Sequence, residues 1–139
     1  MTILKKIDYL LPILYPEFYT VIDNSNNELV FLKTEEKLIS EPFKTDDKTQ
    51  SEAFINHFHI CGRVSKSEYI LVEKIGKIVA YNLLERLKLS FPQKKFVVYL
   101  EINYKDSTII RFHQLWKDEP PYFDLSVKYR DSIIFEYKN

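Results

Sequence analysis

The chain has very few of the residues that build common cofactor and metal sites. Two of its 139 residues are glycine, Gly62 and Gly76, and one, Cys61, is cysteine. A dinucleotide-binding fingerprint and a P-loop each need several glycines close together, so both are excluded. A single cysteine can form neither an internal disulfide nor a cysteine-rich zinc site, and it favours a reducing compartment. We therefore expect a cytoplasmic protein without a cofactor.

An excess of one charge sign is missing too, because 20 Lys and Arg residues balance 20 Asp and Glu residues. A general nucleic-acid binder needs a basic face to neutralise phosphates, so neutrality argues against that class. No apolar run approaches the length of about 18 residues that a membrane span needs. Asp8, Pro12 and Pro16 interrupt the N-terminal apolar run, which does not resemble a signal peptide. The length fits one domain, residues 1–139, that binds neither nucleic acid nor membrane.

Hydrophobic periodicity predicts two helices. Residues 3–11 have helical spacing, and Pro12 is expected to end this short helix. Ser65 and Glu68 have capping-box spacing ahead of an apolar stripe, which predicts a long helix over 66–89.

Runs of β-branched and aromatic residues predict the strands. Turn signals at 23–27 and 105–106 indicate two hairpins. The charged stretch 33–52 lacks periodicity and is predicted to be a long loop with a short strand at 38–39. The predicted strands are 18–22, 29–32, 53–63, 96–104, 107–116 and 132–137.

These elements predict an α+β fold: an antiparallel sheet of about five strands, with one long helix packed on one face and a short N-terminal helix. Ferredoxin-like and NTF2-like arrangements both place helices on one side of such a sheet. On the other face, Arg111 is expected to pair with Glu101 across a hairpin. The side chains expected to face the long helix are Phe54, Phe58, Ile60, Val98, Leu100, Ile102, Ile110, Phe112, Ile133 and Phe135.

Histidines supply the pattern most suggestive of catalysis or metal binding. Strand geometry places His57, His59 and Cys61 on one face, and His113 could join them from another strand. Sequence alone places no acidic residue as a further ligand. Residues i and i+4 on a strand stand about 13 Å apart, so a thiol–imidazole pair would need His113. We predict no metal site and no catalytic residue.

The segment 111–124 contains the one tryptophan and two aromatic residues that follow a Pro-Pro pair. Aromatic residues and Arg often anchor protein interfaces, because they bury a large area at low entropic cost. We expect this segment and the charged loop 35–52 to contact a partner. The expected partner-binding residues are Arg111, His113, Trp116, Asp118, Glu119, Tyr122, Asp46 and Asp47.

The pattern Phe-His-Gln-x-Trp-x-x-Glu-Pro-Pro-Tyr at 112–122, in a small neutral chain, resembles bacterial immunity proteins. These are encoded beside polymorphic or contact-dependent growth-inhibition toxins. The resemblance implies a non-enzymatic protein that binds the C-terminal domain of its cognate toxin and occludes the active site. One alternative is a small NTF2-like or related enzyme with His57, His59 or His113 as its acid or base. Another is a homodimeric structural subunit joined through the exposed sheet face.

Overall fold

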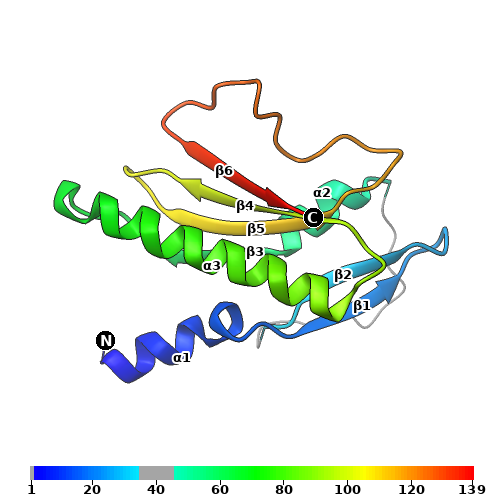
Figure 1. The fold of residues 1–139 in the computed structure, drawn as a ribbon, viewed down its shortest axis with the longest axis horizontal. Helices are drawn as coiled ribbons and strands as arrows, with labels where there is room; N and C mark the ends of the chain where they lie inside the picture. Colours follow the sequence, from blue (N-terminus) through cyan, green and yellow to red (C-terminus); the bar gives the residue numbers. More distant parts are fainter. Residues whose placement is uncertain (1, 35–45) are drawn as a thin grey trace.

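The computed structural model describes residues 2–34 and 46–139, and it confirms the mixed α+β class with antiparallel strand pairing (Figure 1). The elements are α1 (Ile3–Leu14), β1 (Phe18–Ile22), β2 (Glu28–Leu32), α2 (Lys48–Ile55), β3 (His57–Cys61), a 3₁₀ turn (Lys66–Glu68), α3 (Tyr69–Ser90), β4 (Phe96–Ile102), β5 (Thr108–Gln114) and β6 (Ile133–Lys138).

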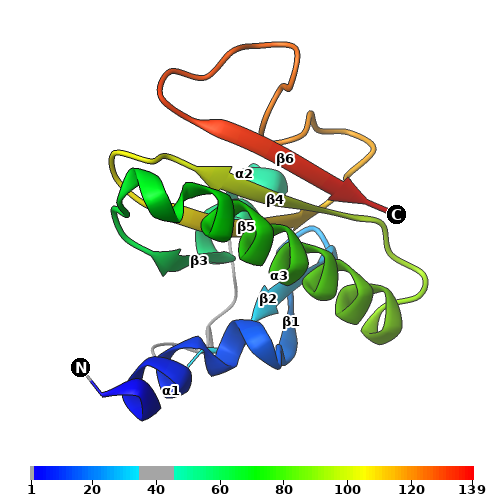
Figure 2. The same ribbon diagram turned by 60° about the vertical axis from the view of Figure 1, so that its left-hand side comes forward.

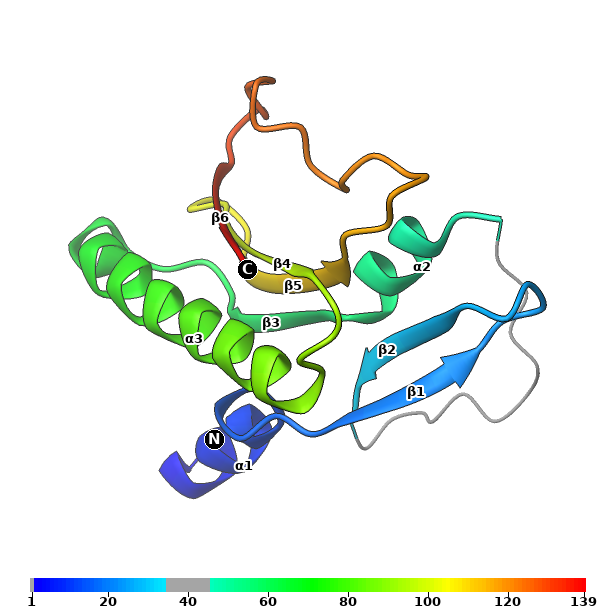
Figure 3. The ribbon, with the colours of Figure 1, turned by 45° about the vertical axis from the view of Figure 1, so that its right-hand side comes forward.

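The strands of the described residues form two sheets rather than one sheet of about five. One has four strands in the order β3-β5-β4-β6, and the other is the β1-β2 hairpin. The long helix α3 lies across one face of the four-stranded sheet, as predicted (Figure 3). It approaches closely at Gly76, where an added Cβ would stand 2.7 Å from a methyl of Leu100. The capping box of Ser65 and Glu68 is also present.

Most side chains expected to face α3 do form the core. Six of the ten are buried in one cluster, namely Phe58, Val98, Leu100, Ile102, Ile110 and Phe112, and Ile60 and Phe135 pack against it. The other two predictions were wrong. Phe54 is 72% exposed because it belongs to a helix and not to a strand, and Ile133 is 46% exposed at the start of the edge strand β6.

Pro12 does not end the first helix, contrary to expectation. It lies inside α1, which continues to Leu14 and is followed by Pro16. The N–H of Tyr15 still donates to the carbonyl of Leu11 at 2.9 Å. A proline removes one backbone hydrogen bond of its own, and this loss is tolerated here within the last turn.

Helix α2 occupies residues predicted to be loop (33–52) and strand (53–63). The strand that was expected over 53–63 is shorter, and begins at His57. The short strand predicted at 38–39 lies outside the described residues, as does much of the loop 35–52. The expected fold was therefore correct in class and wrong in the path between β2 and β3.

Two polar side chains, from the last turn of α2 and its C-cap, form hydrogen bonds to the edge of β2 that does not pair with β1. We call this the inner edge of β2. Asn56, at the end of α2, accepts from the N–H of Leu32 and donates to the carbonyl of Val30, both at 2.8 Å. Glu52 accepts from the N–H of Val30 at 2.8 Å. The carbonyl of Asn56 also accepts from the N–H of Phe112 in β5 at 3.2 Å. The helix thus links the two sheets through hydrogen bonds that a neighbouring strand would otherwise make.

The connection from β5 to β6, residues 115–132, arches over the face of the four-stranded sheet opposite α3 (Figure 3). We call it the β5–β6 loop. The ring of Phe123 stands edge-on to Tyr99 of β4, with 5.0 Å between the centroids. Tyr99 is fully buried, and burial raises its pKa to about 12. The sheet face expected to be exposed is therefore covered by this loop.

Candidate partner-binding site

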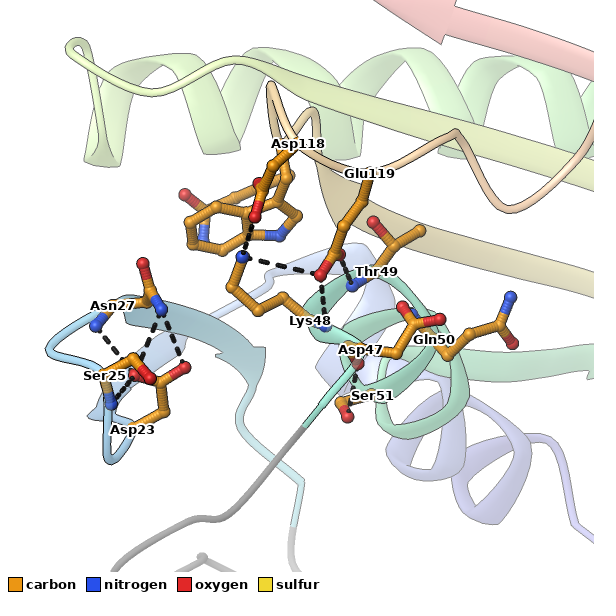
Figure 4. Close-up of polar contacts among 12 residues, drawn as sticks. Asp23, Ser25, Asn27, Asp47, Lys48, Thr49, Gln50, Ser51, Asp118 and Glu119 are labelled. Carbon is orange, nitrogen blue, oxygen red and sulfur yellow. Dashed lines mark hydrogen bonds and ion pairs between the residues drawn. The ribbon is translucent and has the colours of Figure 1, made fainter.

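The N-terminus of α2 is held by carboxylates from two parts of the chain (Figure 4). Asp47 is the N-cap residue, and its carboxylate accepts from the N–H of Gln50 at 2.9 Å. Glu119, from the β5–β6 loop, accepts from the N–H groups of Lys48 and Thr49 at 3.1 and 2.7 Å. The first N–H groups of a helix have no partner within the helix, so these carboxylates stabilise it. We call this contact the α2 junction, comprising residues 46–49 and 116–119.

A lysine stands at the centre of the α2 junction. The Nζ of Lys48 lies 2.9 Å from a carboxylate oxygen of Asp118 and 3.5 Å from one of Glu119. It also lies 5.0 Å from the centre of the Trp116 ring. The hydrogen bond to Asp118 raises the pKa of Lys48 and lowers the pKa of Asp118. Burial acts to raise the pKa of Glu119, but the N–H donors and Lys48 together hold it below its ordinary value.

Beneath the α2 junction lies Glu52, a buried carboxylate that the sequence analysis did not single out. Its oxygens accept from the backbone and side-chain N–H groups of Gln114 at 3.0 and 2.9 Å, and from the indole of Trp116 at 2.7 Å. The bond from Val30 makes a fourth. Burial raises the pKa of this carboxyl, and the four N–H donors oppose that rise. Glu52 lies four residues before Asn56, a spacing that places both side chains on one face of a helix. This was the available signal in the sequence, and it can be used only once α2 is known to be a helix.

His113 fixes the β5–β6 loop from below. Its Nδ1 lies 2.7 Å from the carbonyl of Gln114, which requires a proton on Nδ1. Its Nε2 then accepts from the N–H of Tyr122 at 3.1 Å and from the hydroxyl of Tyr99 at 3.3 Å. Burial lowers the pKa of His113, which favours the neutral ring that this arrangement needs.

The side chain of Arg111 contacts three other parts of the chain. The expected ion pair with Glu101 is confirmed, with 2.8 Å between Nε and a carboxylate oxygen. A guanidinium N–H donates to the carbonyl of Ala53, near the end of α2, at 2.7 Å. The guanidinium also lies 4.7 Å from the centre of the Tyr122 ring. Arg111 therefore joins β4, α2 and the β5–β6 loop.

The structure brings the eight residues expected to bind a partner into one connected region, but they differ in exposure. Arg111 and His113 are 8% and 1% exposed, so their side chains serve the interior. The side chain of Glu119 is 13% exposed and that of Asp118 is 69% exposed. Asp46 and Asp47 are exposed, whereas Trp116 and Tyr122 are half-buried. Lys117 in the same range is exposed too, so the α2 junction carries four carboxylates against two lysines, and its net charge is negative.

The other two histidines lie elsewhere. His57 and His59 line a cleft of about 730 Å³ between α1, β3 and the ends of the β1-β2 hairpin. Their ring centroids are 5.4 Å apart, and Nδ1 of His57 is hydrogen-bonded to the carbonyl of Phe54. A register shift separates His59 from the half-buried Cys61. The remaining lining residues include Lys5, Asp8, Tyr9, Glu17 and Lys33. Over residues 2–34 and 46–139, no group of three or more His, Cys, Asp or Glu side chains is placed to hold a metal ion.

No helix in the described part of the chain has the length and apolar content needed to cross a membrane. Comparison with curated proteins and with solved structures gives no significant match. A family model matches residues 11–138, from the last turns of α1 to the end of β6. The chain therefore belongs to the family described as Uncharacterized protein PM0498.

Proposed function

We propose that the chain is a non-enzymatic immunity protein that binds the C-terminal domain of a cognate bacterial toxin in the cytoplasm and occludes its active site. The proposal starts from the resemblance of residues 112–122 to immunity proteins. The observation that carries it is the α2 junction, where residues distant in sequence meet and leave an acidic rim facing outward.

The ionisable groups of this region support binding rather than catalysis. Glu52 and His113 are 0% and 1% exposed, and their side chains are hydrogen-bonded to other groups of the protein. A general acid or base must reach the proton that it transfers. These groups instead fix α2 and the β5–β6 loop, so that the surface is rigid before a partner arrives, which limits the entropy lost on binding.

The acidic rim determines the chemistry of the partner surface. Asp46, Asp47 and Asp118 present carboxylates to solvent, and Lys117 is the one exposed cation among residues 46–49 and 116–119. The charge of Lys48 points at Asp118 and Glu119. A rim of this kind fits a basic surface, and rim charges mainly raise the association rate and select the partner. Trp116 and Tyr122 supply half-buried aromatic area beside it.

The test is to search the neighbouring genes for one that encodes a toxin-like protein and to co-express the C-terminal domain of that protein with the full chain. Growth rescue and co-purification are expected. Asp46→Lys should weaken binding about tenfold by reversing one rim charge, whereas Asp106→Lys, in the exposed turn between β4 and β5, should leave it unchanged. A folded chain that neither rescues growth nor binds the toxin domain would exclude the proposal.

The cleft beside β3 favours a second candidate, an enzyme that uses His57 and His59 as acid and base. Both imidazoles reach the cleft, and Lys5 and Lys33 add positive charge. His113 takes no part, since it lies buried beneath the β5–β6 loop. A screen of small carboxylates and phosphates, followed through the ring protons of both histidines by NMR, tests this candidate. It fails if no ligand shifts the two rings together.

A further inference from the structure

Helix α1 lies on the side of the molecule away from the β5–β6 loop (Figure 2), and it exposes five large aliphatic side chains. They share one sector of the helix, and we call them the α1 stripe. Their exposed fractions are 74% for Ile3, 75% for Leu4, 51% for Ile7, 48% for Leu11 and 48% for Leu14.

The α1 stripe is not the face with which the helix packs on its own domain. That face includes Ile13, which is 1% exposed, and Leu10, which packs against the core. At 100° per residue, Leu10 lies only about 20° around the helix from Ile3, whereas Ile13 lies about 170° from the line through Leu4 and Leu11. The apolar surface of α1 is therefore wider than the part that its own domain covers, and the α1 stripe is the part left exposed.

The spacing within the stripe fits a second helix. Leu4, Ile7, Leu11 and Leu14 follow one another at intervals of three, four and three residues. This is the narrow a/d pattern with which one helix packs along another. Helices that lie on membranes instead have a strongly basic polar face. Here Lys5, Lys6 and Asp8 leave a balance of a single positive charge.

The exposed area is enough for a small interface. Taken together, the five fractions equal about three fully exposed Leu or Ile side chains, or about 300 Å² of apolar surface per copy. Two copies would bury about 600 Å². Apolar atoms make up about 60% of an interface, so the total would be about 1,000 Å², near the lower limit for specific association.

We propose that two copies of the chain associate through their α1 stripes, about a twofold axis. A twofold contact uses the same surface of both copies, so one self-complementary stripe is sufficient. The small area is typical of a weak, reversible dimer, whose population should depend on the protein concentration. The surface is separate from the α2 junction, so the dimer leaves the acidic rim free, and it does not depend on the proposed immunity function.

Sedimentation-velocity analysis of the full chain between 1 and 200 µM tests the proposal. The mass should rise with concentration from 16.7 kDa towards twice that value. Leu11→Glu places a charge at the centre of the stripe and should keep the chain monomeric at 200 µM. The matched control is Ile78→Glu on α3, which is 61% exposed and lies outside the stripe, and it should dimerise as the native chain does.

Circular dichroism and thermal melting confirm that each variant is folded, which is expected because both positions are largely exposed. A native chain that stays monomeric at 200 µM overturns the proposal. So does a Leu11→Glu variant that dimerises normally, or an Ile78→Glu variant that also dissociates. If the native chain is monomeric but sediments with vesicles of anionic phospholipid, the stripe binds membranes and the dimer is refuted.

Discussion

Asn56 should be among the residues on which the stability of this fold depends most, and the substitution Asn56→Leu tests this. The side chain is 1% exposed and makes two hydrogen bonds to the inner edge of β2, one to the N–H of Leu32 and one to the carbonyl of Val30. Leucine has a similar size and can make neither bond. The substitution therefore removes the polar contacts with little change in volume.

The expected magnitude follows from the groups left behind. A buried N–H or C=O without a partner costs about 1–3 kcal/mol, so two of them cost about 2–6 kcal/mol. The more apolar side chain recovers about 1 kcal/mol. We expect a net loss of about 1–5 kcal/mol in the free energy of unfolding, against a total stability of about 5–15 kcal/mol for a typical domain.

Urea unfolding followed by circular dichroism measures this loss, which should lower the midpoint by about 0.5–2.5 M at a slope of about 2 kcal/mol/M. Amide hydrogen exchange adds a local readout. The N–H of Leu32 should exchange faster, whereas that of Val30, bound to Glu52, should follow the change in global stability alone. The control Asn82→Leu, at a half-buried position on α3, should change stability by no more than about 0.5 kcal/mol.

A loss below about 1 kcal/mol would refute the reasoning, because it would mean that the edge of β2 finds other partners at little cost. Unchanged relative protection of the Leu32 and Val30 amides would refute it too. In that case α2 would hold the two sheets together by packing rather than by hydrogen bonds.

Three further predictions concern the same framework. His113→Gln should flatten the pH dependence of stability. Burial lowers the pKa of His113, so the unfolded chain binds a proton at this residue before the folded chain does as the pH falls through about 6.5. In urea unfolding, the native protein should therefore lose more stability between about pH 7.5 and 5.5 than the variant loses. Gly76→Ala should destabilise the fold by about 1 kcal/mol although alanine is the better helix former, because the new Cβ would lie 2.7 Å from a methyl of buried Leu100. The control is Gly62→Ala, where the new Cβ would have nothing within 4 Å, and equal thermal midpoints of the two variants would contradict the prediction. Glu119→Gln keeps one acceptor oxygen for two N–H groups, so it should cost about 1 kcal/mol and speed amide exchange at Lys48 or Thr49, whereas Asp118→Asn should not alter that exchange.

Features that depend on neighbouring residues were predictable from the sequence. The apolar stripe and the capping box of Ser65 and Glu68 locate α3 to within a residue or two at its end. The turn at 105–106 gives the β4-β5 hairpin, and alternation along it gives the ion pair of Arg111 with Glu101. In each case the signal and the structure lie in the same short segment.

Helix α2 was missed because its stabilisation comes from far along the chain. Its sequence, Lys-Thr-Gln-Ser-Glu-Ala-Phe-Ile, carries little apolar periodicity, and Phe54 and Phe58 alternate in a way that favours a strand. The contacts that favour the helix come from Glu119, about 70 residues later, and from the edge of β2. Local propensity does not report such contacts.

Residue type alone led to the prediction that the residues of the candidate site bind a partner, and it gave no information on the contacts among them. Trp116, Asp118 and Glu119 were expected to face a partner, and the last of these is mostly committed to the N-terminus of α2. Glu52 lies in a polar stretch with no motif, so its central place could not be foreseen. The sequence identifies the residues with strong chemistry, while the fold decides which of them remain outside.

The polar side chains that bind β2 also protect the chain from aggregation. Leu29–Leu32 is a short run of Leu, Val, Phe and Leu without charge or proline, a composition that favours pairing with other strands when its edge is open. Its outer edge pairs with β1, and Glu52 and Asn56 occupy the inner edge. Open strand edges recruit strands from other chains. Glu52 and Asn56 thus keep the inner edge of β2 from pairing with a strand of another molecule.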